Sequence, residues 1–379
     1  MSKPGFGPII DADSHLSEDL ARMAELTDER FRHHAPRMVQ FGPDEVMYMA
    51  GEYAPQPRGM TWADTSSRGA LHEKHRTLGK WSQAEQVGYD PKLRLKMMDE
   101  QGVDASVIFP SQGLIVSQVK PPEISAGLCR GVNRYQAEFC AADRTRLYPM
   151  MTIPIGSVDL AIAEATYAVK ELGAVGLFTP AAPSTFPIYH AYYEPLWDAI
   201  EELGVPFCTH TGAAVMQRGL GVERFQGVWP AFHMTTHTIE AMMACLGFFS
   251  YGILDRHPDM KLGFFEAGAG WVPFWIDKLN EKFAGMGWML PELKRSPLRT
   301  FKEQCMVTIE SDEAMLKPTL EFLGGRGVGW SSDVPHFDCE NEGRPDALVE
   351  SKGLSDAHKR RLLCDNVAEF FKIKVKVPA

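Results

Sequence analysis

Three polar side chains at alternate positions end the first apolar run of the sequence. Asp11, Asp13 and His15 lie in the stretch IIDADSHLSED. Alternate residues of a strand face the same side, so a strand here would bring the three groups together. Convergent carboxylates and an imidazole at the end of an apolar strand indicate a metal ion or a catalytic site. The alternative is an exposed strand end, in which a serine followed by Glu18 starts a helix.

Polar residues also stand at the ends of later apolar runs, where a parallel β/α barrel gathers its functional groups. Taken alone, each of them is compatible with a structural role, such as a helix cap or a buried hydrogen bond. They are His210 in VPFCTH, Glu266 in MKLGFFEAG, Glu310 in CMVTIES, and Asp333 with His336 in GVGWSSDVPH.

A predicted helix adds three more candidates. The stretch HMTTHTIEA places His233, His237 and Glu240 at spacings of four and three residues. These spacings bring the three side chains to one face of a helix. Each again has a structural alternative, because a buried histidine can bond a carbonyl group and a glutamate can pair with a lysine.

The coincidence of so many carboxylates and imidazoles at one end of a barrel points to a bound cation. Buried charges without partners would be costly unless a cation neutralised them. The donors are imidazole and carboxylate without thiolate, a set that fits zinc, iron or manganese. Cys208 shares a strand with His210, and we expect it to be a core thiol rather than a ligand.

The composition is that of an ordinary globular protein, with 379 residues of which 45% are hydrophobic and 23% charged. A net charge of -10 disfavours nucleic acid as a partner. The seven cysteines show no CxxC spacing, so neither a disulfide framework nor a zinc ribbon is predicted. The sequence shows neither a long apolar run nor a signal peptide, which predicts a cytoplasmic protein without a membrane partner.

Short apolar runs alternate with longer segments of helical period from about residue 91 onward, which is typical of βα units and a parallel sheet. The absence of a GxGxxG turn after the first strand disfavours a doubly wound open sheet. We therefore predict an α/β fold, a (β/α)8 TIM barrel forming a single domain over residues 1–379. The predicted strands begin with IIDAD and continue at residues 104–110, 146–154, 173–180, 205–210, 260–268, 305–311 and 327–333.

Residues 17–90 interrupt this alternation and are rich in Pro, Gly, Met, His and Arg. A connection of this length is usually functional. Because it leaves from the C-terminal end of the first strand, we predict a lid over the barrel mouth. Its densest basic cluster, HEKHR, is either a solvated surface or a clamp for an anionic group such as a phosphate. The cluster contains His72, Lys74, His75 and Arg76.

The order of four motifs resembles the amidohydrolase-related metal-dependent TIM barrels, a group that includes aminocarboxymuconate-semialdehyde and resorcylate decarboxylases. The motifs are DADSH, THTG, EAGAGW and SSDVPHFD, and together they cover the chain from the first strand to residue 338. The resemblance implies an amidohydrolase-like barrel. It also implies that four residues could hold one metal: Asp13, His15, His210 and Asp333.

The chain departs from the decarboxylases of this group at its sixth strand. Those enzymes have a histidine in a HxGG-like turn, whereas this chain has Glu266 in FFEAGAGW. HTIEA followed by EAGAGWVPFW and SDVPH is instead similar to a branch that includes non-haem diiron monooxygenases, many of which act on coenzyme A-linked substrates. This second resemblance implies two iron ions, with Asp333, Glu266 and His237 as catalytic candidates. Its candidate metal ligands are Asp13, His15, His210, His237, Glu240, Glu266, Asp333 and His336.

The diiron hypothesis implies hydroxylation of a bulky hydrophobic acyl substrate, such as a CoA thioester, with O2 and an external electron donor. The basic cluster at residues 72–76 would then clamp coenzyme A phosphates. The alternative is a hydrolase or decarboxylase with one zinc or manganese ion, in which the metal lowers the pKa of bound water to about 7 and Asp333 is the general base. A non-catalytic binding barrel is a third hypothesis. The apolar helices WVPFWIDKL and MMACLGFFSYGIL predict a homodimer.

Overall fold

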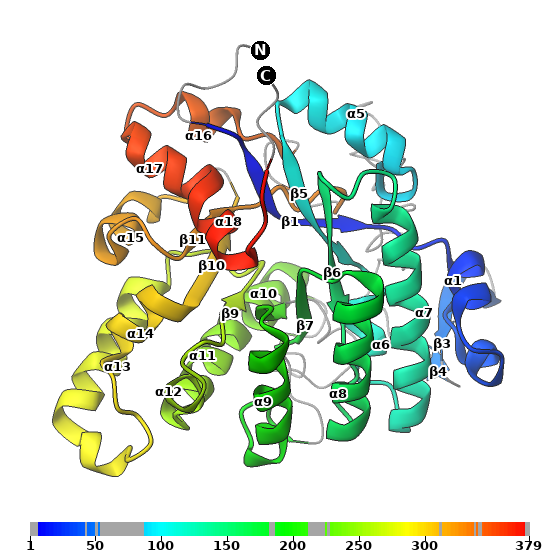
Figure 1. The fold of residues 1–379 in the computed structure, drawn as a ribbon, viewed down its shortest axis with the longest axis horizontal. Coiled ribbons are helices and arrows are strands. Elements are labelled where there is room, and N and C mark those ends of the chain that lie inside the picture. Colours follow the sequence, from blue (N-terminus) through cyan, green and yellow to red (C-terminus); the bar gives the residue numbers. More distant parts are fainter. Residues whose placement is uncertain are drawn as a thin grey trace.

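The chain forms a barrel of parallel strands surrounded by helices (Figure 1). The structure is a computed structural model, and it describes residues 7–41, 44–49, 52–53, 87–181, 186–210, 224–225, 228–310, 313–336, 339 and 343–375. Within this described part of the chain, no helix has the length and apolar character needed to cross a membrane.

Eight parallel strands form the centre, and each pairs with the next barrel strand along the chain. This order confirms the predicted (β/α)8 barrel, and all eight strands lie within or next to their predicted ranges. The strands are β1 (Ile10–Leu16), β5 (Ala105–Pro110), β6 (Leu147–Thr152), β7 (Gly176–Pro180), β8 (Phe207–His210), β9 (Leu262–Phe264), β10 (Cys305–Ile309) and β11 (Val328–Trp330).

The first strand and the segment after the last strand join to close the barrel. The backbone N–H of His15 donates to the carbonyl oxygen of Val334 at 2.7 Å, and the N–H of Asp333 donates to the carbonyl oxygen of Asp13 at 3.0 Å. Asp11 strengthens this seam, because its carboxylate accepts hydrogen bonds from the Ser332 N–H at 2.9 Å and the Ser332 hydroxyl at 2.6 Å.

Helices follow the strands and cover the outside of the barrel. Helix α5 shows how the sequence sets their ends: the Asp90 side chain caps its first turn, proline follows at the first helical position, and Gly102 ends it at φ 75°. The described helices are α1 (Leu20–Leu26), α5 (Pro91–Gln101), α6 (Gly113–Val116), α7 (Pro122–Cys140), α8 (Val158–Tyr167), α9 (Glu194–Leu203), α10 (Trp229–Met234), α11 (Glu240–Ser250), α12 (Ile253–Arg256), α13 (Val272–Met286), α14 (Pro297–Gln304), α15 (Leu316–Leu323), α16 (Asp346–Glu350), α17 (Asp356–Arg360) and α18 (Asn366–Phe371).

Apolar side chains fill the barrel interior below the mouth. Phe109, Phe178 and Phe265 are fully buried, with ring centroids 5.2 to 5.6 Å from Phe109 to each of the other two. Cys208 is fully buried in the same apolar cluster, which confirms the prediction of a core thiol. The interior is therefore a packed floor, and the polar groups stand above it at the C-terminal ends of the strands.

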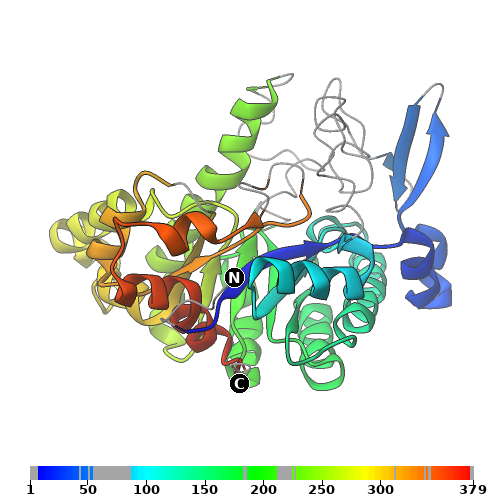
Figure 2. The same cartoon turned by 90° about the horizontal axis from the view of Figure 1, so that it is seen from above.

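The insertion at residues 17–90 begins outside the barrel. Helix α1 packs against α7, where Arg22 bonds the carboxylate of Glu138 and Arg134 bonds the carbonyl oxygen of Leu26. A small antiparallel sheet follows, formed by β2 (Arg37–Phe41), β3 (Asp44–Met49) and β4 (Glu52–Tyr53). Figure 2 shows this hairpin and the α10–α11 helix extending on the same side of the barrel.

Candidate metal centre

Strand β1 delivers the first two candidate ligands. Asp13 and His15 are both buried, and the Nε2 atom of His15 lies 3.5 Å from Asp13 Oδ1 and 3.5 Å from Asp333 Oδ1. The pairing of β1 with β5 shifts its register between Asp11 and Ser14. This irregularity separates the alternating residues, so Asp13 and His15 meet at the mouth while Asp11 stays at the barrel seam.

His210 at the end of β8 completes a first group. Its Nε2 atom lies 3.4 Å from Asp13 Oδ2, and its Nδ1 atom lies 3.3 Å from Glu266 Oε2. The ring of Phe109 underlies both imidazoles, with centroid distances of 5.8 Å to His15 and 4.9 Å to His210. The apolar floor therefore restricts the orientation of both rings.

Glu266 and Asp333 follow β9 and β11, and both have a backbone φ of 54°. Non-glycine residues seldom adopt this left-handed conformation, which is strained and concentrates at functional sites. Hydrogen bonds hold both residues: the Glu266 N–H donates to Thr308 Oγ1 at 3.1 Å, and the Asp333 N–H donates to the Asp13 carbonyl oxygen. The strain directs both carboxylates into the mouth.

His336 lies directly beside this group. Its Nδ1 atom is 2.8 Å from Asp333 Oδ1, and its ring stacks on that of His15 with centroids 3.9 Å apart. Its Nε2 atom is 3.4 Å from the hydroxyl of Ser111. His336 is therefore placed either to bind an ion with Asp333 or to orient that carboxylate.

The three candidates of the predicted helix are divided between neighbouring helical segments. His237 lies in a π-helical turn, Thr235–Ile239, which joins α10 to α11. Such turns often occur at functional sites. His237 Nε2 is 3.5 Å from Glu266 Oε1, and the His233 ring stacks on His237 at 3.6 Å. Glu240 is buried at the start of α11.

Burial and neighbouring charges set the protonation of the site. Burial raises the pKa of Asp13 to about 6, although the His210 imidazole opposes the shift. Burial and two neighbouring imidazoles hold the pKa of His15 well below its usual range. Burial also acts to raise the pKa of Glu266, but the imidazoles of His210 and His237 outweigh it and lower that pKa well below its ordinary value. A neutral His15 beside ionised carboxylates is the state that binds a metal cation.

The donor atoms of these residues fit a metal ion. Among the described residues, neither ring nitrogen of His15 has a hydrogen-bond partner, and the same is true of Asp13 Oδ1, although all three atoms are buried. Buried polar atoms normally have partners, so these donor atoms are suited to bind a metal ion. Two groups have donor atoms within 4.8 Å of one another, and both include His15. They are Asp13, His15 and His210, and His15, Glu266, Asp333 and His336.

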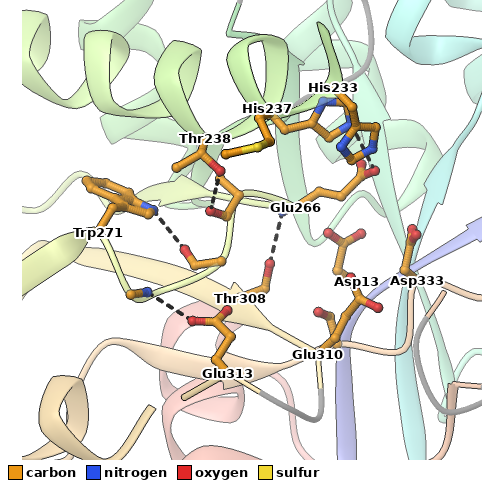
Figure 3. Close-up of a pocket in the computed structure, with 15 residues that line it drawn as sticks. Asp13, His233, His237, Thr238, Glu266, Trp271, Thr308, Glu310, Glu313 and Asp333 are labelled. Carbon is orange, nitrogen blue, oxygen red and sulfur yellow. Dashed lines mark hydrogen bonds and ion pairs between the residues drawn. The ribbon is translucent and has the colours of Figure 1, made fainter. Parts of the chain in front are cut away.

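A pocket of about 400 Å³ opens beside these groups. Figure 3 shows Asp13, Asp333 and Glu310 on one side of it and Glu266 with the two stacked histidines on the other. Its described lining includes five carboxylates and no lysine or arginine, and Trp271 and Met234 supply apolar surface. The predicted clamp at residues 72–76 and half of the predicted lid at residues 17–90 lie outside the described residues.

Some residues of the site were not found by inspection of the strand ends. Glu313 accepts the backbone N–H groups of Ala269 and Gly270 at 2.9 Å, which fixes the loop after Glu266 at the start of α13. Arg94 is buried, and its guanidinium donates to the carbonyl oxygen of His15. Neither residue ends a strand, so the pattern of polar strand ends could not reveal them.

The family model described as Amidohydrolase matches residues 10–373. A gamma-resorcylate decarboxylase from Polaromonas sp. (strain JS666 / ATCC BAA-500) is 24% identical over 297 residues, which cover 74% of this chain and 86% of the relative.

Two solved structures show the same fold. The structure of an amidohydrolase from Mycobacterium avium subsp. paratuberculosis K-10 has a TM-score of 0.75 at 18% identity, and the match covers 96% of this chain and 99% of that one. A dihydroxybenzoic acid decarboxylase from Polaromonas sp. JS666, with bound manganese and the inhibitor 2-nitroresorcinol, has a TM-score of 0.68 at 19% identity over 97% of each chain.

The prediction of a non-haem diiron monooxygenase is wrong. The relative matched in sequence and one of the two solved structures are decarboxylases, the latter with bound manganese. These two proteins contradict iron, O2, an external electron donor and a CoA thioester as parts of the reaction. The prediction depends on His237 and Glu240 helping to bind a second iron. Among the described residues, both are absent from the two convergent groups. The homodimer stays a prediction.

Proposed function

The chain belongs to the amidohydrolase family, and from this premise we propose that it is a metal-dependent decarboxylase of small hydroxylated aromatic acids. The observation that carries the proposal is the convergence of Asp13, His15, His210 and Asp333 at the barrel mouth. The likeness to gamma-resorcylate decarboxylase supports it. One manganese or zinc ion is the cofactor that we propose.

The proposed ligands are Asp13, His15, His210 and Asp333, with Glu266 and His336 beside them. These residues would hold a divalent ion, which would supply positive charge for the oxygen atoms of a substrate. Without it, a substrate carboxylate would face the carboxylates of the pocket, because no lysine or arginine belongs to the described lining. The ion therefore has to provide most of the attraction for an anionic acid.

The reaction breaks the bond between the aromatic carbon and the carboxyl carbon. Carbon dioxide leaves, the electron pair stays on the ring carbon, and that carbon takes up one proton. Asp333 lines the pocket, and its Oδ1 lies 2.8 Å from His336 Nδ1. We assign to Asp333 the transfer of this proton, and to His336 the role of holding the Asp333 carboxyl group in place.

Hydrolysis of a neutral substrate is the second candidate. Glu266 stands where the resemblance to decarboxylases leads us to expect a histidine, and it adds negative charge to the pocket. A neutral ester or amide would meet less repulsion there than an anionic acid. Asp333 would then act as the general base.

The test is turnover by protein stripped with a chelator and reloaded with manganese or zinc. We expect gamma-resorcylate or another dihydroxybenzoate to yield carbon dioxide and the corresponding phenol only in the metal-loaded sample. Chromatography measures the phenol. Asp333→Asn should lower kcat by about 100-fold or more. Asp159→Asn, on the exposed surface of α8, is the matched control and should retain activity.

Absence of turnover with every dihydroxybenzoate, in protein shown to contain metal, would refute decarboxylation of this class. Release of an alcohol or amine from neutral esters or amides would then support hydrolysis. A cytoplasmic location, a single domain over residues 1–379 and a lid at residues 17–90 stay predictions.

A further inference from the structure

Arg94 is a buried cation near the barrel mouth, and the proposed reaction assigns it no role. Its side chain extends from α5, and only 1% of the residue is exposed. Among the described residues, no carboxylate forms an ion pair with it. Burial lowers the pKa of Arg94 to about 10, so it remains charged at neutral pH. A charged group in such a place needs strong hydrogen bonds in compensation.

The guanidinium of Arg94 forms such hydrogen bonds with residues around the candidate metal ligands. One Nη atom donates to the hydroxyl of Ser14 at 2.9 Å. The other donates to the carbonyl oxygen of His15 and, at 3.3 Å, to that of Val334. Its Nε atom donates to the carbonyl oxygen of Val87 at 3.3 Å. The acceptors around the Nη atoms are residues that carry or adjoin ligands of the proposed metal.

These bonds join the two segments that must be aligned for the metal site to form. His15 belongs to β1, and Val334 follows Asp333 after β11. The Val334 carbonyl oxygen accepts hydrogen bonds from both the His15 N–H and one Nη atom of Arg94. The guanidinium is planar and rigid, so it fixes the relative position of its acceptors more closely than a flexible ammonium would. The separation of 3.5 Å between His15 Nε2 and Asp333 Oδ1 depends on this alignment.

We propose that Arg94 is a positioning residue of the metal centre, which holds the backbone of His15 and Val334 so that His15 and Asp333 converge on one ion. This inference rests on the metal site of the proposed function. It does not depend on which reaction the bound metal supports. Among the described residues, Arg94 belongs neither to the pocket lining nor to the two groups of donor atoms.

The test measures affinity for Mn²⁺, by competition with a fluorescent chelator, in the full chain. Loss of an outer contact of a metal ligand typically weakens affinity 10- to 100-fold. We expect this range for Arg94→Met. Arg94→Lys keeps the charge but loses the fork, so we expect an intermediate loss, and it also serves if the methionine variant fails to fold. In the Co²⁺-loaded protein, the visible absorption bands should shift in both variants.

Arg146 offers a matched control at the opposite end of the barrel. Its side chain bonds the carbonyl oxygens of Val103 at 2.9 Å and Asp104 at 3.0 Å, just before β5 begins. Arg146→Met should lower the unfolding temperature while Mn²⁺ affinity and the Co²⁺ spectrum stay unchanged. A purely structural role for Arg94 would give its variants this same result.

The inference is overturned if Arg94→Met or Arg94→Lys, folded by circular dichroism, binds Mn²⁺ within twofold of the parent. It is also overturned if Arg146→Met weakens binding equally, or if the parent binds no Mn²⁺. A parent protein that binds Mn²⁺ but converts no dihydroxybenzoate would refute the proposed function alone. The two failures are therefore distinguishable.

Discussion

Glu18 is a buried acid that the fold keeps protonated. Its Oε1 atom accepts the backbone N–H of Gln112 at 2.8 Å, while Oε2 has no hydrogen-bond partner among the described residues. Burial raises the pKa of Glu18 from 4.5 to about 8, although the bond from Gln112 opposes the shift. At pH 7 most folded molecules therefore carry a proton on this carboxyl group.

This proton makes stability depend on pH. The folded-state pKa lies above the unfolded value, so the folded protein binds more protons between pH 4.5 and 8 and loses stability as the pH rises through that range. At pH 7, about 2.5 units above the unfolded pKa, the group destabilises the fold by about 3 kcal/mol, at about 1.4 kcal/mol per unit. Below pH 4.5 this cost disappears.

Glu18→Gln should remove most of the cost. The amide oxygen can still accept the Gln112 N–H, and glutamine needs no proton. Its amide group adds a buried donor without a partner, which costs about 1 to 2 kcal/mol. We therefore expect a net gain of about 1 to 2 kcal/mol in the free energy of unfolding at pH 7, and a loss at pH 5.

Guanidinium chloride unfolding of the metal-free protein, followed by tryptophan fluorescence at pH 5, 6, 7 and 8, measures this gain. The matched control is Glu123→Gln on the exposed first turn of α7, which should leave the pH profile unchanged. If the Glu18→Gln and parent profiles run parallel, or if the variant is less stable at pH 7, then Glu18 is not protonated in the fold.

Three further predictions concern the barrel seam, the loop after β9 and the metal. Asp11→Ala should lower the free energy of unfolding by about 3 kcal/mol, because the N–H and hydroxyl of Ser332 lose their buried acceptor; an unchanged denaturant midpoint would contradict this. Glu313→Ala should lower the free energy of unfolding by about 1 to 2 kcal/mol, since the N–H groups of Ala269 and Gly270 lose their acceptor. Thermal unfolding measures this loss, and a midpoint equal to that of the parent protein would contradict it. Mn²⁺ at about 100 times its Kd should stabilise the protein by about 2.7 kcal/mol, and a thermal midpoint that a chelator does not lower would argue against a metal site.

The sequence was sufficient to predict the barrel strands, because each one is a short apolar run between turns and helical segments. It was not sufficient to predict how the barrel closes. Closure depends on hydrogen bonds between residues more than 300 positions apart, such as those from Ser332 to Asp11. Asp11 looks equivalent to Asp13 in an ideal strand, and only the register shift in β1 separates their roles.

The site was predictable in so far as it consists of strand ends. Asp13, His15 and His210 converge as the alternation of the strands implies. Arg94 could not be predicted from the sequence, because LRLKMMDE in helix α5 has the pattern of an ordinary charged surface helix. No neighbouring residue indicates that the side chain of this arginine is buried. The prediction of a second metal failed for a related reason. Helical spacing alone does not show whether the side chains of His237 and Glu240 reach the donor atoms at the strand ends.

The left-handed backbone at Glu266 and Asp333 has a consequence for protein engineering. Glycine adopts this conformation without strain, whereas a longer side chain loses on the order of 1 kcal/mol there. Glu266→Gly or Asp333→Gly would therefore remove a carboxylate and relax the chain at the same time. Both acidic residues lower the stability of the fold. In a library of variants selected only for thermal stability, we therefore expect these two carboxylates to be replaced first.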